Sequence, residues 1–232
     1  LMLRSGNDCA EALALHTSGS IDAFAQRMNE TAQKAGALES CFKNPHGLPL
    51  EGHYTTARDL NLIACYAMQN DAFRQIVGTR YYQPRNWANK NKMLKNYEGA
   101  VGIKTGYTKQ AGRCLVSAAE KKGMTLVCTV LNCSPMYERS QQLLDEAFAA
   151  YENVRILGAD TPVRVKVKGK TEAGYTKEDL YYPLLPEEQL HLKMEIISRE
   201  EMGAMGKNDE IIGQIKIYLI NRLLFSRNLY KL

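Results

Sequence analysis

The run Gly102-Ile103-Lys104-Thr105-Gly106-Tyr107-Thr108 places a cation, a hydroxyl and a bare backbone position next to one another. In an extended strand, Lys104 and Gly106 would lie on one face and Thr105 on the other. Gly106 would leave the strand edge open to a peptide that adds through main-chain hydrogen bonds, while Lys104 and Thr105 offer a charge and a hydroxyl to an anionic end group. The alternative is a Lys-Thr-Gly that only ends a strand at a turn.

A second element with a reactive hydroxyl, Ser5-Gly6-Asn7, lies near the amino end. By itself a Ser-x-Asn is a helix-capping turn, because about one chance occurrence is expected in a chain of this size. Serine acyl-transfer enzymes that recognise penicillin combine Ser-x-x-Lys, a Ser-x-Asn type element and Lys-Thr-Gly. We therefore expect the hydroxyl of Ser5 and the ammonium of Lys104 to meet beside one groove.

Three further segments extend the pattern. Residues 42–49 read Phe-Lys-Asn-Pro-His-Gly-Leu-Pro, residues 54–60 read Tyr-Thr-Thr-Ala-Arg-Asp-Leu, and residues 89–94 read Asn-Lys-Asn-Lys-Met-Leu. In the order and spacing of these motifs, most of residues 1–151 resembles the serine D-alanyl-D-alanine carboxypeptidases, which are low-molecular-weight penicillin-binding proteins. The resemblance implies an α+β, β-lactamase/transpeptidase-like catalytic domain over residues 1–151.

The resemblance also implies roles for six residues. Ser5 would relay a proton, Asn7 would bind the substrate amide carbonyl, and Lys104 would keep Ser5 poised. The substrate-binding residues would be Thr105, Gly106 and Tyr107, with the Tyr107 backbone N–H as half of an oxyanion hole. The implied reaction removes the terminal D-alanine from a peptidoglycan stem peptide through an acyl-serine intermediate.

The family's nucleophilic Ser-x-x-Lys precedes its Ser-x-Asn element, and here only Leu1 to Arg4 come before Ser5. The chain's Ser-x-x-Lys, Ser40 to Lys43, follows Ser5 instead, so we reject it as the nucleophile. We expect that the sequence lacks the amino-terminal part of the catalytic domain. These residues alone should then neither hydrolyse D-Ala-D-Ala peptides nor form a covalent adduct with penicillin.

Composition limits the choice of partners. The 232 residues are 45% hydrophobic and carry a net charge of +5, with no basic block and no nucleic-acid-binding motif, so we expect no nucleic-acid partner. The resemblance implies instead a stem peptide ending in D-Ala-D-Ala as substrate and β-lactam antibiotics as inhibitors of the full-length enzyme. It also implies an extracytoplasmic place in the bacterial cell envelope, with membrane association only through a segment outside this sequence.

No cofactor or metal is expected. The six cysteines show no Cys-x-x-Cys pair and no histidine spacing typical of zinc. We favour free, buried thiols, because most of these positions lie in apolar periodic stretches. If the protein is exported, a disulfide is the alternative, and Cys114 with Cys128 is then the best candidate pair.

Periodicity places the remaining elements. Helices are expected over residues 9–15 with Asp8 as the cap, from Ile21 to a carboxyl cap at Gly36, from a capping box at Thr56 and Asp59, and over residues 136–151. Residues 113–119 and 124–131 should pair as a hairpin. After residue 152 the pattern alternates at 163–168, 190–196 and 215–219, and a turn at Asn221-Arg222 should lead into a last strand. We expect a small all-β domain, sandwich-like, over residues 152–232.

Two local features have competing interpretations. His46 could be a catalytic base, but we favour a hydrogen-bonded loop histidine, because the resemblance implies chemistry based on lysine and serine. Trp87, Tyr81 and Tyr82 alternate with basic residues, as in single-strand nucleic-acid binding. Since this run leads into the Lys-Thr-Gly strand, we expect it to pack around the cleft instead.

Two other functions fit parts of the sequence. A β-lactamase-type hydrolase shares the motif set, although the trailing β domain and the Asn-Pro-His-Gly-Leu segment favour a carboxypeptidase. The other alternative is a non-catalytic cell-wall binding or scaffold protein, which would never have carried the serine.

Overall fold

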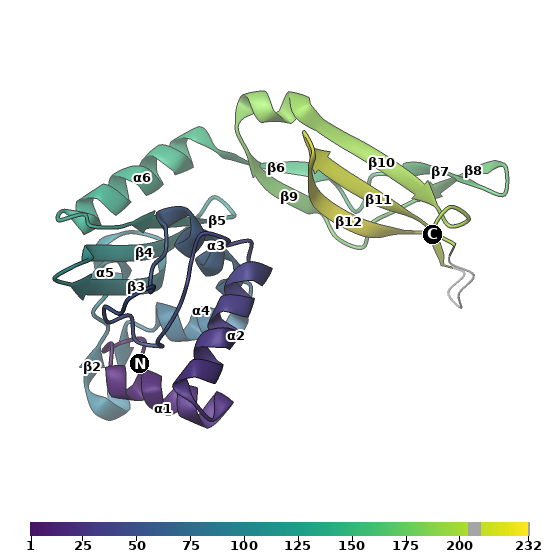
Figure 1. Ribbon diagram of the computed structural model, residues 1–232. Helices are drawn as coiled ribbons and strands as arrows, with labels where there is room; N and C mark the ends of the chain where they lie inside the picture. Colours follow the sequence, from purple (N-terminus) through teal and green to yellow (C-terminus); the bar gives the residue numbers. More distant parts are fainter. Residues whose placement is uncertain (204–209, 232) are drawn as a thin grey trace. The chain divides into compact units, whose positions relative to one another are not determined.

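A computed structural model describes residues 1–203 and 210–231. The chain divides into two compact units, Leu1–Phe148 and Ala149–Leu232, so the boundary falls close to the one expected after Tyr151 (Figure 1). Each unit has its own buried apolar cluster. None of the helices in the described part of the chain is long and apolar enough to cross a membrane.

The first unit mixes helices with a small antiparallel sheet. Its helices are α1 (Asn7–Ser18), α2 (Ile21–Lys34), α3 (Ala57–Ala67), α4 (Asp71–Gly78), the short α5 (Met93–Asn96) and α6 (Met136–Ala150). The main sheet has the order β3 (Ala100–Thr108), β4 (Gly112–Lys121) and β5 (Met124–Val130). The ribbon β1 (Tyr81–Tyr82) and β2 (Trp87–Ala88) encloses the 3-10 turn η1 (Gln83–Arg85).

Helices cover the sheet on both sides (Figure 1). On one side α6 buries Met136, Leu144 and Phe148. On the other, α3 and α4 pack against the strands, where Thr129 Oγ1 lies 3.1 Å from Asn61 Oδ1. The expected hairpin is confirmed, because Lys121 pairs with Met124 across a turn at Lys122 and Gly123. Both residues of this turn have positive φ, as a type I′ turn requires.

Most expected helices are confirmed, and one expected cap is wrong. Ser20 caps α2, Gly36 follows its end with φ of 81°, and Thr56 Oγ1 accepts from the Asp59 N–H at the start of α3. Helix α1 begins earlier than predicted, with Gly6 as its N-cap and no side-chain cap bond, so Asp8 lies inside its first turn.

The second unit is built of strands, as expected. They are β6 (Glu152–Leu157), β7 (Val163–Val167), β8 (Lys170–Gly174), β9 (Leu180–Leu184), β10 (Leu192–Ser198), β11 (Ile211–Leu219) and β12 (Arg222–Tyr230), with a 3-10 segment η2 (Pro186–His191). The pairs β6-β9 and β7-β8 accompany a three-stranded sheet of order β10-β11-β12. The core joins Leu157, Val165, Leu180, Ile215 and Leu229, and so combines strands from all three sheets.

The apolar residues that alternate over residues 190–196 are more exposed than the pattern predicted. Leu190 lies in η2 and is 85% exposed, while Met194 and Ile196 in β10 are 50% and 42% exposed. Their partners Ile217 and Ile215 in β11 are fully buried. Strand β10 lies at the edge of its sheet. Its apolar residues face the same side as their partners in β11, but the core that covers β11 does not cover them.

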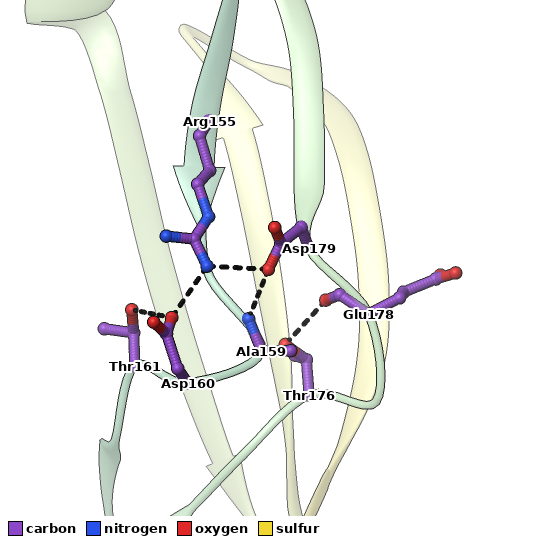
Figure 2. A network of polar contacts seen from close by, with 7 residues as sticks. All are labelled: Arg155, Ala159, Asp160, Thr161, Thr176, Glu178 and Asp179. Carbon is purple, nitrogen blue, oxygen red and sulfur yellow. Dashed lines mark hydrogen bonds and ion pairs between the residues drawn. The ribbon is translucent and has the colours of Figure 1, made fainter.

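A polar network closes one end of the β6-β9 pair. Figure 2 shows Arg155 directed between two carboxylates, with Nη2 2.7 Å from Asp160 Oδ1 and 2.8 Å from Asp179 Oδ1. The Ala159 N–H also donates to Asp179 Oδ1, at 2.8 Å. The hydrogen bond from Arg155, followed by the one from Ala159, lowers the pKa of Asp179 below its ordinary value.

Candidate active site

Lys104 and Ser5 meet in the first unit. Strand β3 carries Lys104, and the turn that precedes α1 carries Ser5. Lys104 Nζ donates hydrogen bonds to Ser5 Oγ and to the carbonyl oxygen of Thr105. The expected contact between these two groups is confirmed, although they lie 99 positions apart in the sequence.

The backbone of Ser5 has a conformation that non-glycine residues rarely adopt. Ser5 has φ of 57°, and its N–H donates to the carbonyl oxygen of Leu1 at 2.7 Å. A non-glycine residue in this region costs on the order of 1–3 kcal/mol and is often found at functional sites. Since Gly6, and not Ser5, is the N-cap of α1, the helix does not use this hydroxyl, and the capping interpretation of Ser-Gly-Asn is wrong. Asn7, the first residue of α1, is exposed.

The ammonium of Lys104 lies in an unfavourable environment. Burial, followed by the positive charge of Lys90, lowers the pKa of Lys104 below its ordinary value. A lysine with a lowered pKa gives up its proton more readily near neutral pH. The pair can therefore pass a proton between the amine and the Ser5 hydroxyl.

Strand β3 offers a free edge to a peptide. In the described part of the chain its only strand partner is β4, so the other side of β3 has unpaired backbone groups. Exposure increases along the strand from the buried Ile103 to the exposed Gly106 and Tyr107, the latter 68% exposed. A Cβ at Gly106 would meet only the Cβ of Cys114, at 3.7 Å, so no described protein atom fills the space beside it.

The hydroxyl of Ser40 is hydrogen-bonded within the protein. Its hydroxyl lies 2.7 Å from Asp59 Oδ2 and 2.8 Å from Thr55 Oγ1, while the Lys43 side chain is exposed. Asp59 is only 2% exposed and also accepts from the Glu39 N–H at 2.7 Å. Ser40 therefore anchors a loop to the start of α3, which agrees with its rejection as a nucleophile.

His46 is the hydrogen-bonded loop histidine that was expected. Its Nδ1 accepts from the Leu48 N–H at 3.2 Å, and its Nε2 lies 3.3 Å from Glu11 Oε1. Both ring nitrogens are thus engaged within the protein. No cluster of three or more His, Cys, Asp or Glu side chains that could hold a metal occurs among residues 1–203 and 210–231.

The segment before β3 is partly open to solvent. Tyr81, Tyr82 and Trp87 are between 41% and 49% exposed, and their packing around a cleft stays a prediction. The charge of Lys90 acts on Lys104, and only its position in the Asn-x-Asn run could have suggested that the two lie near each other. The neighbouring Asn91 helps to line a hollow of about 510 Å³, and its Nδ2 has no hydrogen-bond partner among the residues that the structure describes.

The cysteines are free thiols in the structure, but the prediction that they are mostly buried is wrong. Cys128 is buried, whereas Cys9 and Cys65 are exposed and the other three are intermediate. In the β4-β5 hairpin Cys128 pairs with Ser117. Leu115 pairs with Val130, and Cys114 is the residue before Leu115. Cys114 and Cys128 are therefore not cross-strand partners.

Known proteins resemble this chain in sequence. The family model described as D-alanyl-D-alanine carboxypeptidase matches residues 1–134. The D-alanyl-D-alanine carboxypeptidase DacF of Bacillus subtilis is 36% identical over 179 residues, which cover 72% of this chain and 46% of DacF. A D-alanyl-D-alanine carboxypeptidase of Streptomyces is 38% identical and covers 56% of this chain and 51% of its own length. The chain thus spans about half the length of these curated relatives.

Solved structures show the same fold. Penicillin binding protein 5 from Haemophilus influenzae superposes with a TM-score of 0.69 at 26% identity, covering 99% of this chain and 70% of that one. A mutant of the Streptomyces K15 DD-transpeptidase superposes with a TM-score of 0.61 at 33% identity, covering 64% of this chain and 65% of that one. The α+β fold expected from the sequence is confirmed.

Proposed function

Because this chain belongs to the D-alanyl-D-alanine carboxypeptidase family, we propose that its first unit holds the substrate and relays protons in a serine D-Ala-D-Ala carboxypeptidase. The observation that carries the proposal is the contact between Lys104 Nζ and Ser5 Oγ. Two unrelated segments bring a cation and a hydroxyl together there, beside the free edge of β3.

The substrate peptide adds to the edge of β3. The cation of Lys104 and the hydroxyl of Thr105 hold its terminal carboxylate. The backbone N–H of Tyr107 points to the carbonyl oxygen that becomes negative when the peptide bond is attacked, and Asn7 binds the preceding amide carbonyl. Gly106 lacks a side chain, so the peptide main chain can approach the strand closely.

Proton transfer falls to Ser5. When an acyl-serine intermediate forms, the attacking hydroxyl loses a proton and the leaving D-alanine amine gains one. The Ser5 hydroxyl, polarised by Lys104, passes that proton on to the leaving nitrogen. We assign no nucleophile within these 232 residues, since the hydroxyl of Ser40 is bound by Asp59 and Thr55.

The finer assignments follow from the same family. We propose a peptidoglycan stem peptide as the substrate, β-lactam antibiotics as inhibitors of the complete enzyme, and a place in the bacterial cell envelope. The same proposal includes the hydrolytic reaction, a role in cell-wall maturation and cell shape, and any membrane association.

Peptide binding to the 232-residue chain tests the proposal without requiring turnover. In an NMR titration, a peptide ending in D-Ala-D-Ala should shift the backbone amides of Thr105, Gly106 and Tyr107, and the same peptide ending in L-Ala-L-Ala should not. Gly106→Val places two methyl groups where the peptide backbone must lie, so we expect binding to weaken at least tenfold.

Gly106→Val should leave the fold intact, because a Cβ at this position meets no close neighbour and valine favours strands. Its unfolding midpoint in urea is the control. Equal shifts with D- and L-peptides, or unchanged binding by the folded Gly106→Val variant, would contradict the proposed function.

A further inference from the structure

Strand β10 leaves one edge of its sheet open. In the part of the chain that the structure describes, its only strand partner is β11, so the backbone groups on its other side pair with no strand. Two of its apolar side chains are also exposed, Met194 at 50% and Ile196 at 42%. An open edge that exposes apolar side chains is a surface to which another strand can add.

The hydrogen-bond pattern shows which backbone groups of β10 point outward. His191 and Arg199, just outside its two ends, are hydrogen-bonded to residues that continue the same register on the β11 side. In an antiparallel ladder hydrogen-bonded pairs alternate with non-hydrogen-bonded pairs, so the odd-numbered residues of β10 bond to β11. The even-numbered residues therefore direct their backbone groups to the open edge: these are Leu192, Met194 and Ile196.

Local hydrogen bonds close the two ends of this edge. The Ser198 N–H donates at 2.8 Å and its carbonyl oxygen accepts at 3.1 Å, both within the turn that follows β10. At the other end, the Leu192 N–H donates to the last turn of η2. Among the described residues, the groups that remain for a partner are the Leu192 carbonyl and both backbone groups of Met194 and Ile196.

These backbone groups are complementary to those of a second copy. In an antiparallel pair of β10 strands centred on Met194, Leu192 of each copy lies opposite Ile196 of the other. The Met194 N–H then donates to the Met194 carbonyl of the other copy, and the Ile196 N–H donates to the Leu192 carbonyl. The pairing is the same seen from either copy, as a two-fold interface requires.

The charges of β10 fit the same register. Lys193 and Glu195 alternate with the outward-bonding residues, and both side chains are exposed. No ion pair formed by residues 1–203 and 210–231 includes either of them, although the Tyr218 hydroxyl lies 3.1 Å from Glu195 Oε2. In the pair centred on Met194, Lys193 of each copy faces Glu195 of the other at a non-hydrogen-bonded position, where side chains come closest.

We propose that two copies of this chain associate through β10, so that their β10-β11-β12 sheets join into one continuous sheet across a two-fold axis. The contacts between Lys193 and Glu195 fix the register, and the second copy covers Met194 and Ile196. This interface belongs to the second unit alone and does not depend on the proposed function.

Amide hydrogen exchange on the 232-residue chain tests the geometry. When the protein concentration is raised until sedimentation shows a dimer, the N–H groups of Met194 and Ile196 should exchange at least about tenfold more slowly. Those of Lys193 and Glu195 bond to β11 in either state, so their rates should not change. A chain that stays monomeric up to millimolar concentration, or a dimer in which Met194 and Ile196 exchange as fast as in the monomer, would overturn the proposal.

Exchanging the charges tests the register. Lys193→Glu places two carboxylates opposite each other and Glu195→Lys places two ammonium groups there, so each variant alone should dimerise at least about tenfold more weakly. An equimolar mixture of the two variants restores opposite charges at every such position. Sedimentation equilibrium should therefore show that the mixture dimerises about as tightly as the wild-type chain.

Lys170→Glu is the matched control, because it makes the same change of charge at an exposed lysine of β8. It should keep the wild-type dissociation constant, and the urea unfolding midpoint checks that all three variants fold. A dimer held by another surface, such as the free edge of β3, would be insensitive to Lys193→Glu and Glu195→Lys. That result, or a mixture that dimerises no more tightly than either variant alone, would contradict the β10 interface.

Discussion

Lys104 is kept partly out of water and close to a second positive charge, which disfavours its protonated form. The unfolded chain holds that proton more tightly than the folded chain. At a pH below the pKa that Lys104 has in the folded state, the buried positive charge therefore lowers the free energy of unfolding. The cost disappears as pH rises from that value toward the ordinary lysine pKa of about 10.4.

Replacing Lys104 should consequently stabilise the protein. We expect Lys104→Met to raise the free energy of unfolding by about 1 kcal/mol at pH 7, a gain typical of residues retained for function. The gain should vanish near pH 10.5, because the wild-type lysine then no longer carries its charge into the folded state. Urea unfolding followed by Trp87 fluorescence measures both values.

The exposed Lys109 provides the control for this experiment. Lys109→Met should change stability by less than about 0.5 kcal/mol at either pH. A loss of stability in Lys104→Met at pH 7 would show that the hydrogen bonds to Ser5 and Thr105 outweigh the cost of burying the charge.

At the scale of single residues, the sequence identified residue types of the site but did not show which residues lie next to them. Lys104 and Ser5 could be identified because short motifs specify them. Lys90 could not, since its place depends on how a loop returns to the strand. The register of the β4-β5 hairpin also separates Cys114 from Cys128, which their distances from the turn did not reveal.

Helix α3 depends on a carboxylate that the sequence suggested only as a cap. The Asp59 N–H is bonded to Thr56, as in a capping box, but its side chain turns away and accepts from Glu39 and Ser40. The capping pattern predicted where the helix starts. It could not show that Asp59 also fixes the preceding loop, because that contact joins residues 20 positions apart.

Asp59→Ala should be strongly destabilising. It removes the buried acceptor of the Glu39 N–H and one of the two partners of the Ser40 hydroxyl, and we expect a loss of about 3 kcal/mol. Asp71→Ala removes an exposed acid from the first turn of α4 and should cost less than about 1 kcal/mol. Comparable losses in urea unfolding of the two variants would contradict the anchoring role of Asp59.

The strands of the second unit show where pattern reading fails. The alternating valines of β7 were recognised, and Val165 is fully buried. Strands β8 and β9 were missed, because Lys170–Gly174 has almost no apolar residues and Leu180–Leu184 contains Pro183, which is rare inside strands. These strands form through pairing with β7 and β6, which one segment alone does not reveal.

The two units have separate apolar cores, so the second should fold without the first. We expect residues 149–232 expressed alone to give dispersed amide signals and a cooperative unfolding transition by circular dichroism. A fragment with random-coil amide shifts would show that its core needs the first unit.

The contact between Ser5 and Lys104 also orders events during synthesis. The serine leaves the ribosome 99 residues ahead of the lysine, whereas the hairpins β3-β4 and β4-β5 pair neighbouring segments and can close as soon as they emerge. The nascent chain must therefore carry its amino-terminal turn unpaired until the sheet exists. The contact between Ser5 and Lys104 is in this way formed late, after most of the first unit has been translated.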